Sequence, residues 1–382
     1  MSSNYYYCYA RSINHLKSGF FVKIFFLIDI LIRGVKMKKI IFFLFLGFFI
    51  NTYATNTSTI VMDTDTGRIL YQNNAYEKKL IASTTKIMTF VVAYEYAKDF
   101  LDVEVEAGDE ILKMYGTSIY LSYHEAMPLR DLLYGLMLRS GNDAAVVIAN
   151  FVGGSEEGFV KLMNKKAQKL GMYQTTFHNP HGLDEKTQNY STAYDMALLS
   201  IYASKIPFYE KVTNTKYYQV KTKEKSYSWT NRNKMIFTYP YFQTGKTGYT
   251  PKAGRTFVST AQKDNLHLTV VTLNEPNIYD VHRMLYEEMF KKYKKILLVS
   301  KEEFSLEYPS MTIRKDLYYP LLESEIKNIT KKIMINEDTK EKELIISLKD
   351  KEILKEKIIS YEKKEKIKSN NNLWELIKNI FR

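Results

Sequence analysis

The residues of this chain that could do chemistry together lie in three short motifs. In chain order these are Ser83-Thr84-Thr85-Lys86, Ser140-Gly141-Asn142 and Lys246-Thr247-Gly248. They supply a serine hydroxyl, two lysines, a second hydroxyl and a side-chain amide. These groups are the ones needed to activate a hydroxyl without histidine and to attack an amide carbonyl. The composite pattern therefore indicates serine acyl transfer.

The first motif supplies the candidate nucleophile and base, Ser83 and Lys86, which would share one face of a helix predicted over residues 83–96. A lysine can act as a base near neutral pH only if its pKa falls, through burial or through a second cation such as Lys246. The same Ser-x-x-Lys pattern occurs at Ser324–Lys327 and Ser360–Lys363. Those copies lie in charge-rich segments, which we interpret as surface.

The second motif lies between two predicted helices, where a turn could aim its side chains into a cleft. Ser140 could pass a proton to a leaving amine, and Asn142 could hold a substrate amide. In the simpler interpretation, Ser140 and Gly141 only end one helix, and Asn142 or Asp143 caps the next. Both interpretations can hold together.

The third motif precedes a strand-like stretch, and its residue types are able to bind the carboxylate end of a substrate. Lys246 and Thr247 could hold a carboxylate by charge and hydrogen bond. Gly248 would let a substrate backbone approach an edge strand closely. An oxyanion hole needs two converging N–H donors, for which the amides of Ser83 and Tyr249 are the candidates.

The elements around these motifs predict an α+β fold in which helices flank an antiparallel sheet. Short strands after about residue 306 predict a small all-β domain. The expected strands are 58–63, 68–71, 257–261 and 266–273, and the expected helices are 83–96, 129–138, 144–152, 156–170, 192–204 and 280–295.

The ends of the chain suggest export and a membrane contact. Residues 37–54 have the basic start, apolar run and small-residue site of a secretory signal peptide, which makes 1–36 an upstream extension from a start codon placed too early. An extra N-terminal membrane helix is the alternative.

We expect a catalytic domain at 55–302 and a β domain at 303–368. At 369–382 we expect a linker and an amphipathic helix, Leu373 to Arg382, that lies on the membrane. Docking of that helix on its own domain is the alternative.

Composition excludes several other classes of protein. The chain of 382 residues carries a formal net charge of +13, but its lysines alternate with glutamates, so no nucleic-acid partner is expected. Cys8 is the only cysteine, which leaves no disulfide and no cysteine metal site. His178 and His181 lack a third ligand, so we expect no metal and no cofactor.

The motifs and their neighbourhoods resemble the penicillin-binding, serine-type D-alanyl-D-alanine carboxypeptidases of low molecular weight. The resemblance runs from about Ser58 to the C-terminus, and the segments that carry it are 82–89, 139–144, 181–184, 191–197, 231–233 and 246–250.

The resemblance implies a β-lactamase/transpeptidase-like fold and removal of the terminal D-alanine from peptidoglycan pentapeptides through an acyl-enzyme on Ser83. It also implies inhibition by β-lactams and a location on the periplasmic, extracytoplasmic face of the cytoplasmic membrane. Lys86 would be the base, with Ser140, Asn142 and Lys246 as its partners. Arg232 matches an arginine near the substrate carboxylate. Tyr249 replaces a histidine that is frequent in the family, so substrate preference can differ.

Two alternatives remain open at this point. A class A-like β-lactamase shares the three motifs, and Glu185 with Asn189 imitates the Glu-x-x-x-Asn pair with which such enzymes activate water. Gly141, the His181–Asp184 segment and the β domain favour the carboxypeptidases instead. A catalytically silent scaffold that binds the cell wall is the second alternative, and the intact motifs argue against it.

Overall fold

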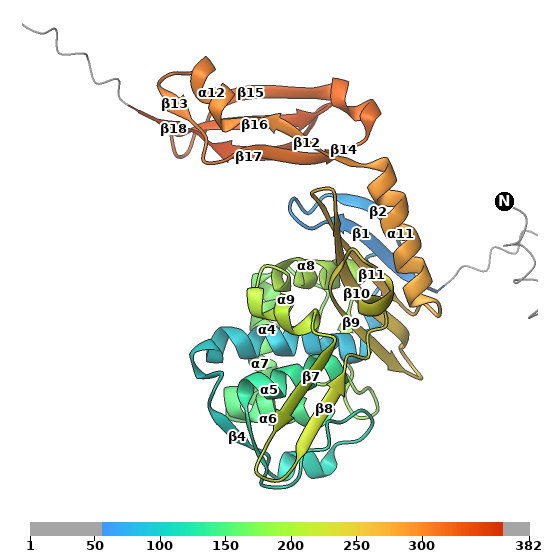
Figure 1. Ribbon diagram of the computed structural model, residues 1–382. Helices are drawn as coiled ribbons and strands as arrows, with labels where there is room; N and C mark the ends of the chain where they lie inside the picture. The colour runs from blue at the N-terminus through green and yellow to red at the C-terminus, as the bar shows by residue number, and fades with distance from the viewer. Residues whose placement is uncertain (1–55, 362–382) are drawn as a thin grey trace, which may run out of the picture. The chain divides into compact units, whose positions relative to one another are not determined.

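The computed structural model describes residues 56–361. Its largest sheet has five antiparallel strands in the order β2-β1-β11-β10-β9, so that β9, which carries the third motif, lies at an edge (Figure 1). The strands are β1 (Ser58–Asp63), β2 (Ile69–Asn73), β9 (Phe242–Thr250), β10 (Gly254–Lys263) and β11 (Leu266–Leu273).

Helices pack on both faces of this sheet. On one face α11 (Ile278–Lys292) buries Tyr286, whose hydroxyl hydrogen-bonds Ser259 of β10 at 2.8 Å, in a cluster with other side chains of β10 and β11. On the other face lies the larger core, whose central helix α4 (Lys86–Ala97) is apolar nearly all round and is correspondingly buried. Around α4 lie α6 (Asn142–Gly153), α7 (Glu156–Lys169), α8 (Ala193–Ala203) and α9 (Pro207–Thr213).

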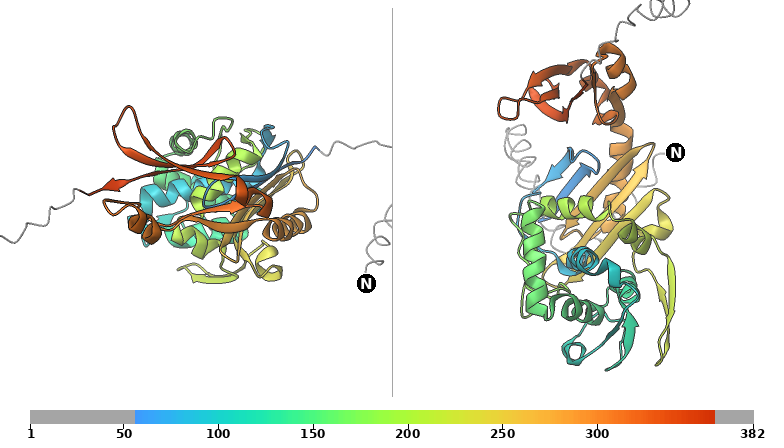
Figure 2. Two further views of the ribbon diagram at one scale, coloured as in Figure 1. Left: turned by 90° about the horizontal axis from the view of Figure 1, so that it is seen from above. Right: turned by 90° about the vertical axis from the view of Figure 1, so that its left-hand side faces the viewer.

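Short elements complete this region. The hairpin of β7 (Tyr217–Lys221) and β8 (Ser226–Thr230) runs along the teal helical segment in the right-hand view of Figure 2, and Tyr218 stacks on Tyr134 with 3.7 Å between ring centroids. The others are the strands β3 (Lys79–Leu80), β4 (Glu104–Glu106), β5 (Ala126–Pro128) and β6 (Tyr190–Ser191), the helix α10 (Met235–Thr238), and the 3-10 turns η2 (Lys98–Phe100) and η3 (Asp109–Lys113).

Two predicted helices differ in detail from the expected ones, and both differences fall at motifs. The helix expected over 83–96 begins as the 3-10 turn η1 (Ala82–Thr85) and continues as α4. The helix expected over 129–138 is α5 (Leu129–Tyr134) followed by the π-helical segment η4 (Gly135–Arg139). Irregular helical turns of this kind often mark functional sites.

The C-terminal module has its own apolar cluster, which includes Leu298, Phe304, Leu321 and Ile346. The boundary expected between 302 and 303 falls inside α12 and is wrong, because the preceding strand β12 already pairs with β14. The elements are β12 (Lys294–Val299), α12 (Lys301–Glu307), β13 (Met311–Thr312), β14 (Leu317–Leu321), η5 (Glu323–Asn328), β15 (Ile329–Ile335), β16 (Lys342–Leu348), β17 (Lys351–Lys357) and β18 (Ile359–Ser360).

The segments predicted to be an upstream extension, a signal peptide and a membrane-lying helix fall within 1–55 and 362–382, outside the described residues. Within residues 56–361, no helix combines the length and the apolar character that crossing a bilayer requires.

Candidate active site

Lys86 joins the first motif to the second. Its Nζ donates to Ser83 Oγ at 3.1 Å and to Asn142 Oδ1 at 2.7 Å, and a third bond runs to the backbone oxygen of His181 at 2.6 Å. The Lys86 side chain is fully buried. The amine is therefore held in a fixed orientation against the candidate nucleophile.

The surroundings of Lys86 favour its neutral form. Burial lowers its pKa well below the usual value, the positive charge of Lys246 lowers it further, and the Asp143 carboxylate opposes this only in part. These are the two causes that the sequence analysis put forward. When Lys86 is neutral, its two N–H groups still serve Asn142 and the His181 backbone oxygen, and its lone pair faces the Ser83 hydroxyl 3.1 Å away, so it can accept that hydroxyl's proton.

Lys246 and Ser140 form a second hydrogen-bonded pair. Lys246 Nζ donates to Ser140 Oγ at 3.0 Å and to the Thr247 backbone oxygen at 2.8 Å. Burial, and after it the charge of Arg232, lower the pKa of Lys246 to about 7. Lys246 can thus hold or release a proton near neutral pH, one hydrogen bond away from the Ser140 hydroxyl.

The backbone around Ser140 explains how the second motif reaches the site. Ser140 ends the π-helical segment with φ of 63°, a left-handed conformation that is uncommon for a residue with a side chain. Helix α6 then begins at Asn142, whose side-chain nitrogen Nδ2 donates to the Tyr115 backbone oxygen at 2.7 Å. Ser140 and Gly141 therefore separate the two helical segments as expected, but the N-cap of α6 is Gly141 and no side chain caps it, so the capping role foreseen for Asn142 or Asp143 is wrong.

The turn that carries Ser83 packs closely against two glycines. A Cβ at Gly248 would lie 2.8 Å from the Ser83 amide nitrogen, and a Cβ at Gly182 would lie 2.0 Å from the Ala82 carbonyl oxygen. Ala82 itself has φ of 46°. Only residues without a side chain let β9 and the 182 turn approach this closely.

The remaining predicted residues lie on the edge strand or beside it. Thr247 is half-buried, Tyr249 has 61% of its surface exposed, and Arg232 is exposed in the loop after β8. The rival serine and lysine at Ser324 and Lys327 are both exposed in η5, as expected of surface residues.

Asp143 is a supporting residue that sequence reasoning considered only as a helix cap. It is 3% exposed, and its carboxylate accepts from the backbone amides of Ile119 at 3.0 Å and Leu121 at 3.1 Å and from the Ser118 hydroxyl. The same loop reaches the second motif through Thr117 Oγ1, which donates to the Ser140 backbone oxygen at 2.7 Å. In the sequence, the sign of this supporting role was an acidic residue directly after the Ser-Gly-Asn motif.

Asn189 and Glu185 do not form a water-activating pair. Asn189 is buried in the turn that carries His181, where its amide nitrogen donates to Thr85 Oγ1 at 3.0 Å and its oxygen accepts from the His178 amide at 2.7 Å. Glu185 is exposed and hydrogen-bonds the Tyr115 hydroxyl. Asn189 therefore shapes the wall of the site.

The two histidines are not arranged as metal ligands. His181 Nδ1 accepts from the Leu183 amide at 3.0 Å, and burial lowers the His181 pKa to about 3. Across residues 56–361 no group of His, Cys, Asp and Glu side chains has the arrangement of a metal site.

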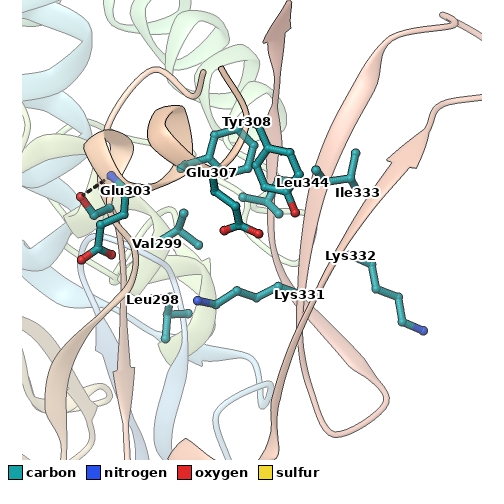
Figure 3. A pocket seen from close by; sticks show the side chains of 11 residues that line it. Leu298, Val299, Glu303, Glu307, Tyr308, Lys331, Lys332, Ile333 and Leu344 are labelled. Carbon is teal, nitrogen blue, oxygen red and sulfur yellow. Dashed lines mark hydrogen bonds between the residues drawn. The ribbon is translucent and has the colours of Figure 1, made fainter. Parts of the chain in front are cut away.

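A separate hollow lies in the C-terminal module (Figure 3). Side chains of β12, α12 and β15 line it, among them Glu307 and Lys331 from facing elements. It contains no residue of the three motifs, so it is not part of the candidate active site.

Comparison with known proteins identifies the family. A family profile described as peptidase S11, D-alanyl-D-alanine carboxypeptidase, matches residues 51–277, more than half of the chain. The chain belongs to this family. The resemblance noted in the sequence is thereby confirmed, and the match includes all three motifs.

Individual relatives agree with this assignment. D-alanyl-D-alanine carboxypeptidase DacF of Bacillus subtilis is 38% identical over 218 residues, which cover 56% of each chain. DacC of Escherichia coli is 36% identical over 231 residues, which cover 56% of this chain and 55% of the relative. The matched region thus spans little more than half the length of these relatives.

Solved structures share the fold. The crystal structure of penicillin binding protein 6B from Escherichia coli matches with a TM-score of 0.64 and 25% identity, over 78% of this chain and 93% of that one. The expected α+β, transpeptidase-like fold of the peptidase S11 chain is confirmed.

Proposed function

We propose that this peptidase S11 chain is a serine D-alanyl-D-alanine carboxypeptidase that removes the terminal D-alanine from peptidoglycan pentapeptides. The observation that supports this most strongly is the buried Lys86 amine, 3.1 Å from Ser83 Oγ. The names of the relatives point to the same substrate class.

In the acylation step, Ser83 Oγ attacks the carbonyl carbon of the penultimate D-alanine. Neutral Lys86 takes the hydroxyl proton as the new C–O bond forms. The oxygen of the tetrahedral intermediate accepts hydrogen bonds from the Ser83 and Tyr249 amides. The Ser83 amide lies where β9 comes closest to the nucleophile, next to Gly248.

The intermediate collapses when the C–N bond to the terminal D-alanine breaks. The leaving nitrogen takes, through the Ser140 hydroxyl, the proton that Lys86 accepted from Ser83, so Lys86 is neutral again; Lys246 holds the Ser140 hydroxyl by a hydrogen bond. Water then attacks the acyl-enzyme, and Lys86 accepts a proton from that water. Hydrolysis frees the shortened peptide and returns the proton to Ser83.

Lys246, Thr247 and Arg232 bind the terminal carboxylate, and Asn142 positions the substrate amide. A β-lactam carries an amide and a carboxylate in a similar arrangement, so it acylates Ser83 and inhibits the enzyme. The β-lactamase alternative is disfavoured because Asn189 is committed to the wall of the site and Glu185 points to Tyr115.

The test is to treat the purified protein with a labelled penicillin and to locate the adduct by mass spectrometry. We expect one adduct on the peptide that carries Ser83, none in Ser83→Ala, and release of D-alanine from a pentapeptide. Rapid release of hydrolysed penicillin without D-alanine formation would instead indicate a β-lactamase. Absence of any adduct would indicate a silent scaffold.

We infer further that the protein is exported by a signal peptide at 37–54. It would lie on the extracytoplasmic face of the cytoplasmic membrane as a peripheral protein, held by Leu373–Arg382. The patterns at both ends of the sequence support this. Truncation before Leu373 should move the protein from the membrane fraction to the soluble fraction, and unchanged fractionation would contradict the anchor. N-terminal sequencing tests the start and the cleavage site.

A further inference from the structure

The hollow in the C-terminal module has a volume of about 250 Å³ and a largely apolar lining. Leu298 and Val299 of β12, Phe304 of α12 and Leu344 of β16 are buried side chains of this lining, and Ile333 of β15 is a half-buried one. An apolar cavity of about 150 Å³ already holds a benzene ring. The hollow is therefore large enough for one bulky aromatic side chain.

Two opposite charges point into the hollow (Figure 3). The Glu307 carboxylate comes from the last turn of α12, and the Lys331 amine comes from β15. Neither side chain makes an ion pair with any residue of the described range, 56–361. A group that binds here should therefore combine a large apolar part with charges that complement both side chains.

The described part of the chain ends next to this hollow. The Tyr361 amide donates to the Ser310 backbone oxygen at 2.8 Å, and β18 pairs with β13. Ser310 is two residues after Tyr308, which lines the hollow. The elements β18, β13 and α12 lie at the same end of the module (Figure 1). The segment that follows Tyr361 in the sequence therefore starts beside the hollow.

That segment is long enough to bring a tryptophan back to the hollow. Residues 362–382 follow Tyr361, and among them Trp374 is the only tryptophan. Twelve residues, 362–373, separate Tyr361 from Trp374. An extended chain spans about 3.3 Å per residue, so a linker of this length can return to a point close to its own start without strain.

The chemistry of the segment matches that of the hollow. The Trp374 indole is large and apolar, and its N–H needs an acceptor when it is buried, which the Glu307 carboxylate offers. Glu375 follows Trp374 directly, and Lys378 lies about one helical turn later. The charges of Glu375 and Lys378 are opposite to those of Lys331 and Glu307, respectively.

We propose that Trp374 docks in the hollow of its own chain when no membrane is present. The tether between Tyr361 and Trp374 gives a local concentration on the order of millimolar, so even a weak contact is well populated. Docking would cover part of the apolar face that is otherwise exposed to water. The hollow and the membrane would then compete for the same segment. This competition rests on the membrane location inferred above, whereas the docking itself does not.

The first measurement is the quenching of Trp374 fluorescence by acrylamide, with the purified protein in buffer without detergent. The difference between the protein and its Trp374→Phe variant isolates the Trp374 signal, because the other tryptophan, Trp229, is common to both. We expect quenching to be about 3- to 10-fold weaker in the protein than in a synthetic peptide of residues 362–382, as for a segment that is docked most of the time.

Variants of the lining test whether the hollow is the binding site. Ile333→Phe, which fills the hollow, should raise quenching to nearly the value of the peptide. Lys331→Glu changes only an exposed side chain and should raise it in part. Met334→Phe is the matched control and should match the wild type, because Met334 is the next residue of β15, is 54% exposed and is not part of the lining. The melting temperature of each variant reports on folding.

The second measurement is binding to vesicles of phosphatidylethanolamine and phosphatidylglycerol. Ile333→Phe should bind about 3- to 10-fold more tightly than the wild type, because docking no longer competes with the membrane. Met334→Phe should bind as the wild type does.

The outcomes separate docking from the membrane location. Quenching as strong in the folded wild type as in the peptide would overturn the docking, and so would protection that persists in folded Ile333→Phe and Lys331→Glu. Protection that increases with protein concentration would mean that the hollow binds the segment of a second copy, which overturns docking within one chain. If no variant binds vesicles, the membrane location fails, while quenching in buffer still decides the docking.

Discussion

Gly248 lies so close to Ser83 that a Cβ on it would come within 2.8 Å of the Ser83 amide nitrogen and 2.4 Å of Thr256 Oγ1. Thr256 Oγ1 in turn donates to the Ile81 backbone oxygen at 3.1 Å. The edge strand and the turn of the nucleophile are thus packed as one unit. The candidate oxyanion hole lies at this contact.

Gly248→Ala should therefore impair catalysis more than folding. The added methyl group must push β9 away from the Ser83 turn, and displaced oxyanion donors typically cost about 10²- to 10³-fold in rate. The measurement is the acylation rate with penicillin. Gly108→Ala is the control, because its new Cβ would meet only the flexible end of Glu110. Equal acylation rates in both variants would contradict the assignment of the oxyanion hole.

Lys246 should reduce the stability of the fold at neutral pH. Its pKa is about 7 in the folded protein, against 10.5 for a lysine exposed to water as in the unfolded chain, so the unfolded chain binds more protons between these values. Stability therefore decreases as pH falls from 10.5 to about 7, and below that range the cost stays constant. The fold keeps this destabilising buried amine because it hydrogen-bonds the Ser140 hydroxyl in the candidate active site.

Lys246→Met should consequently be inactive yet more stable at pH 7, by about 1–3 kcal/mol after allowance for the two lost hydrogen bonds. The gain should shrink as pH approaches 10. Thermal unfolding at several pH values measures it, with the exposed Lys98→Met as the control for loss of one lysine. A variant less stable than the wild type at pH 7 would contradict the linkage.

Substitution of Asp143 should affect both the stability of the loop that contains Ile119 and Leu121 and the pKa of Lys86. Asp143→Asn weakens the hydrogen bonds to the Ile119 and Leu121 amides, and we expect a loss of about 2–3 kcal/mol in the free energy of unfolding. Since the Asp143 carboxylate raises the pKa of Lys86, its neutralisation should also move the acid limb of acylation to lower pH. A shift to higher pH would be the contrary result. Exposed Asp99→Asn serves as the control.

Glu185 should be dispensable for deacylation. It is exposed and contacts the Tyr115 hydroxyl, so Glu185→Gln should change the release of hydrolysed penicillin by less than about twofold. If Glu185→Gln slowed release more than about 100-fold, the β-lactamase mechanism would be favoured.

Asn189→Ala should instead destabilise the protein by about 2–4 kcal/mol, because it removes buried hydrogen bonds.

The sequence predicted the fold class, the family and the pairing of Ser83 with Lys86, because these depend on motif order and on local helical periodicity. It did not predict the left-handed Ser140 or the π-helical turn before it. Those depend on how the turn packs against neighbouring elements, which no local propensity encodes.

The sequence also did not predict contacts between residues that are far apart in the chain. Glu307 and Lys331 belong to separate elements, and only the folded module brings them to the same hollow. The start of the C-terminal module was misplaced for the same reason. The expected helix over 280–295 extends into Lys294 and Lys295, which belong to β12, and this strand is recognised only from its pairing with Leu317–Leu321.

The central claim is that neutral Lys86 activates Ser83, and the pH dependence of acylation by penicillin tests it most directly. Burial lowers the Lys86 pKa, so the second-order rate should fall with a one-proton dependence as pH decreases through that depressed value. Lys86→Arg, permanently charged, should acylate about 10²- to 10⁴-fold more slowly above that pKa, and the difference should shrink at lower pH, whereas exposed Lys98→Arg should match the wild type. Wild-type acylation by Lys86→Arg would contradict the account.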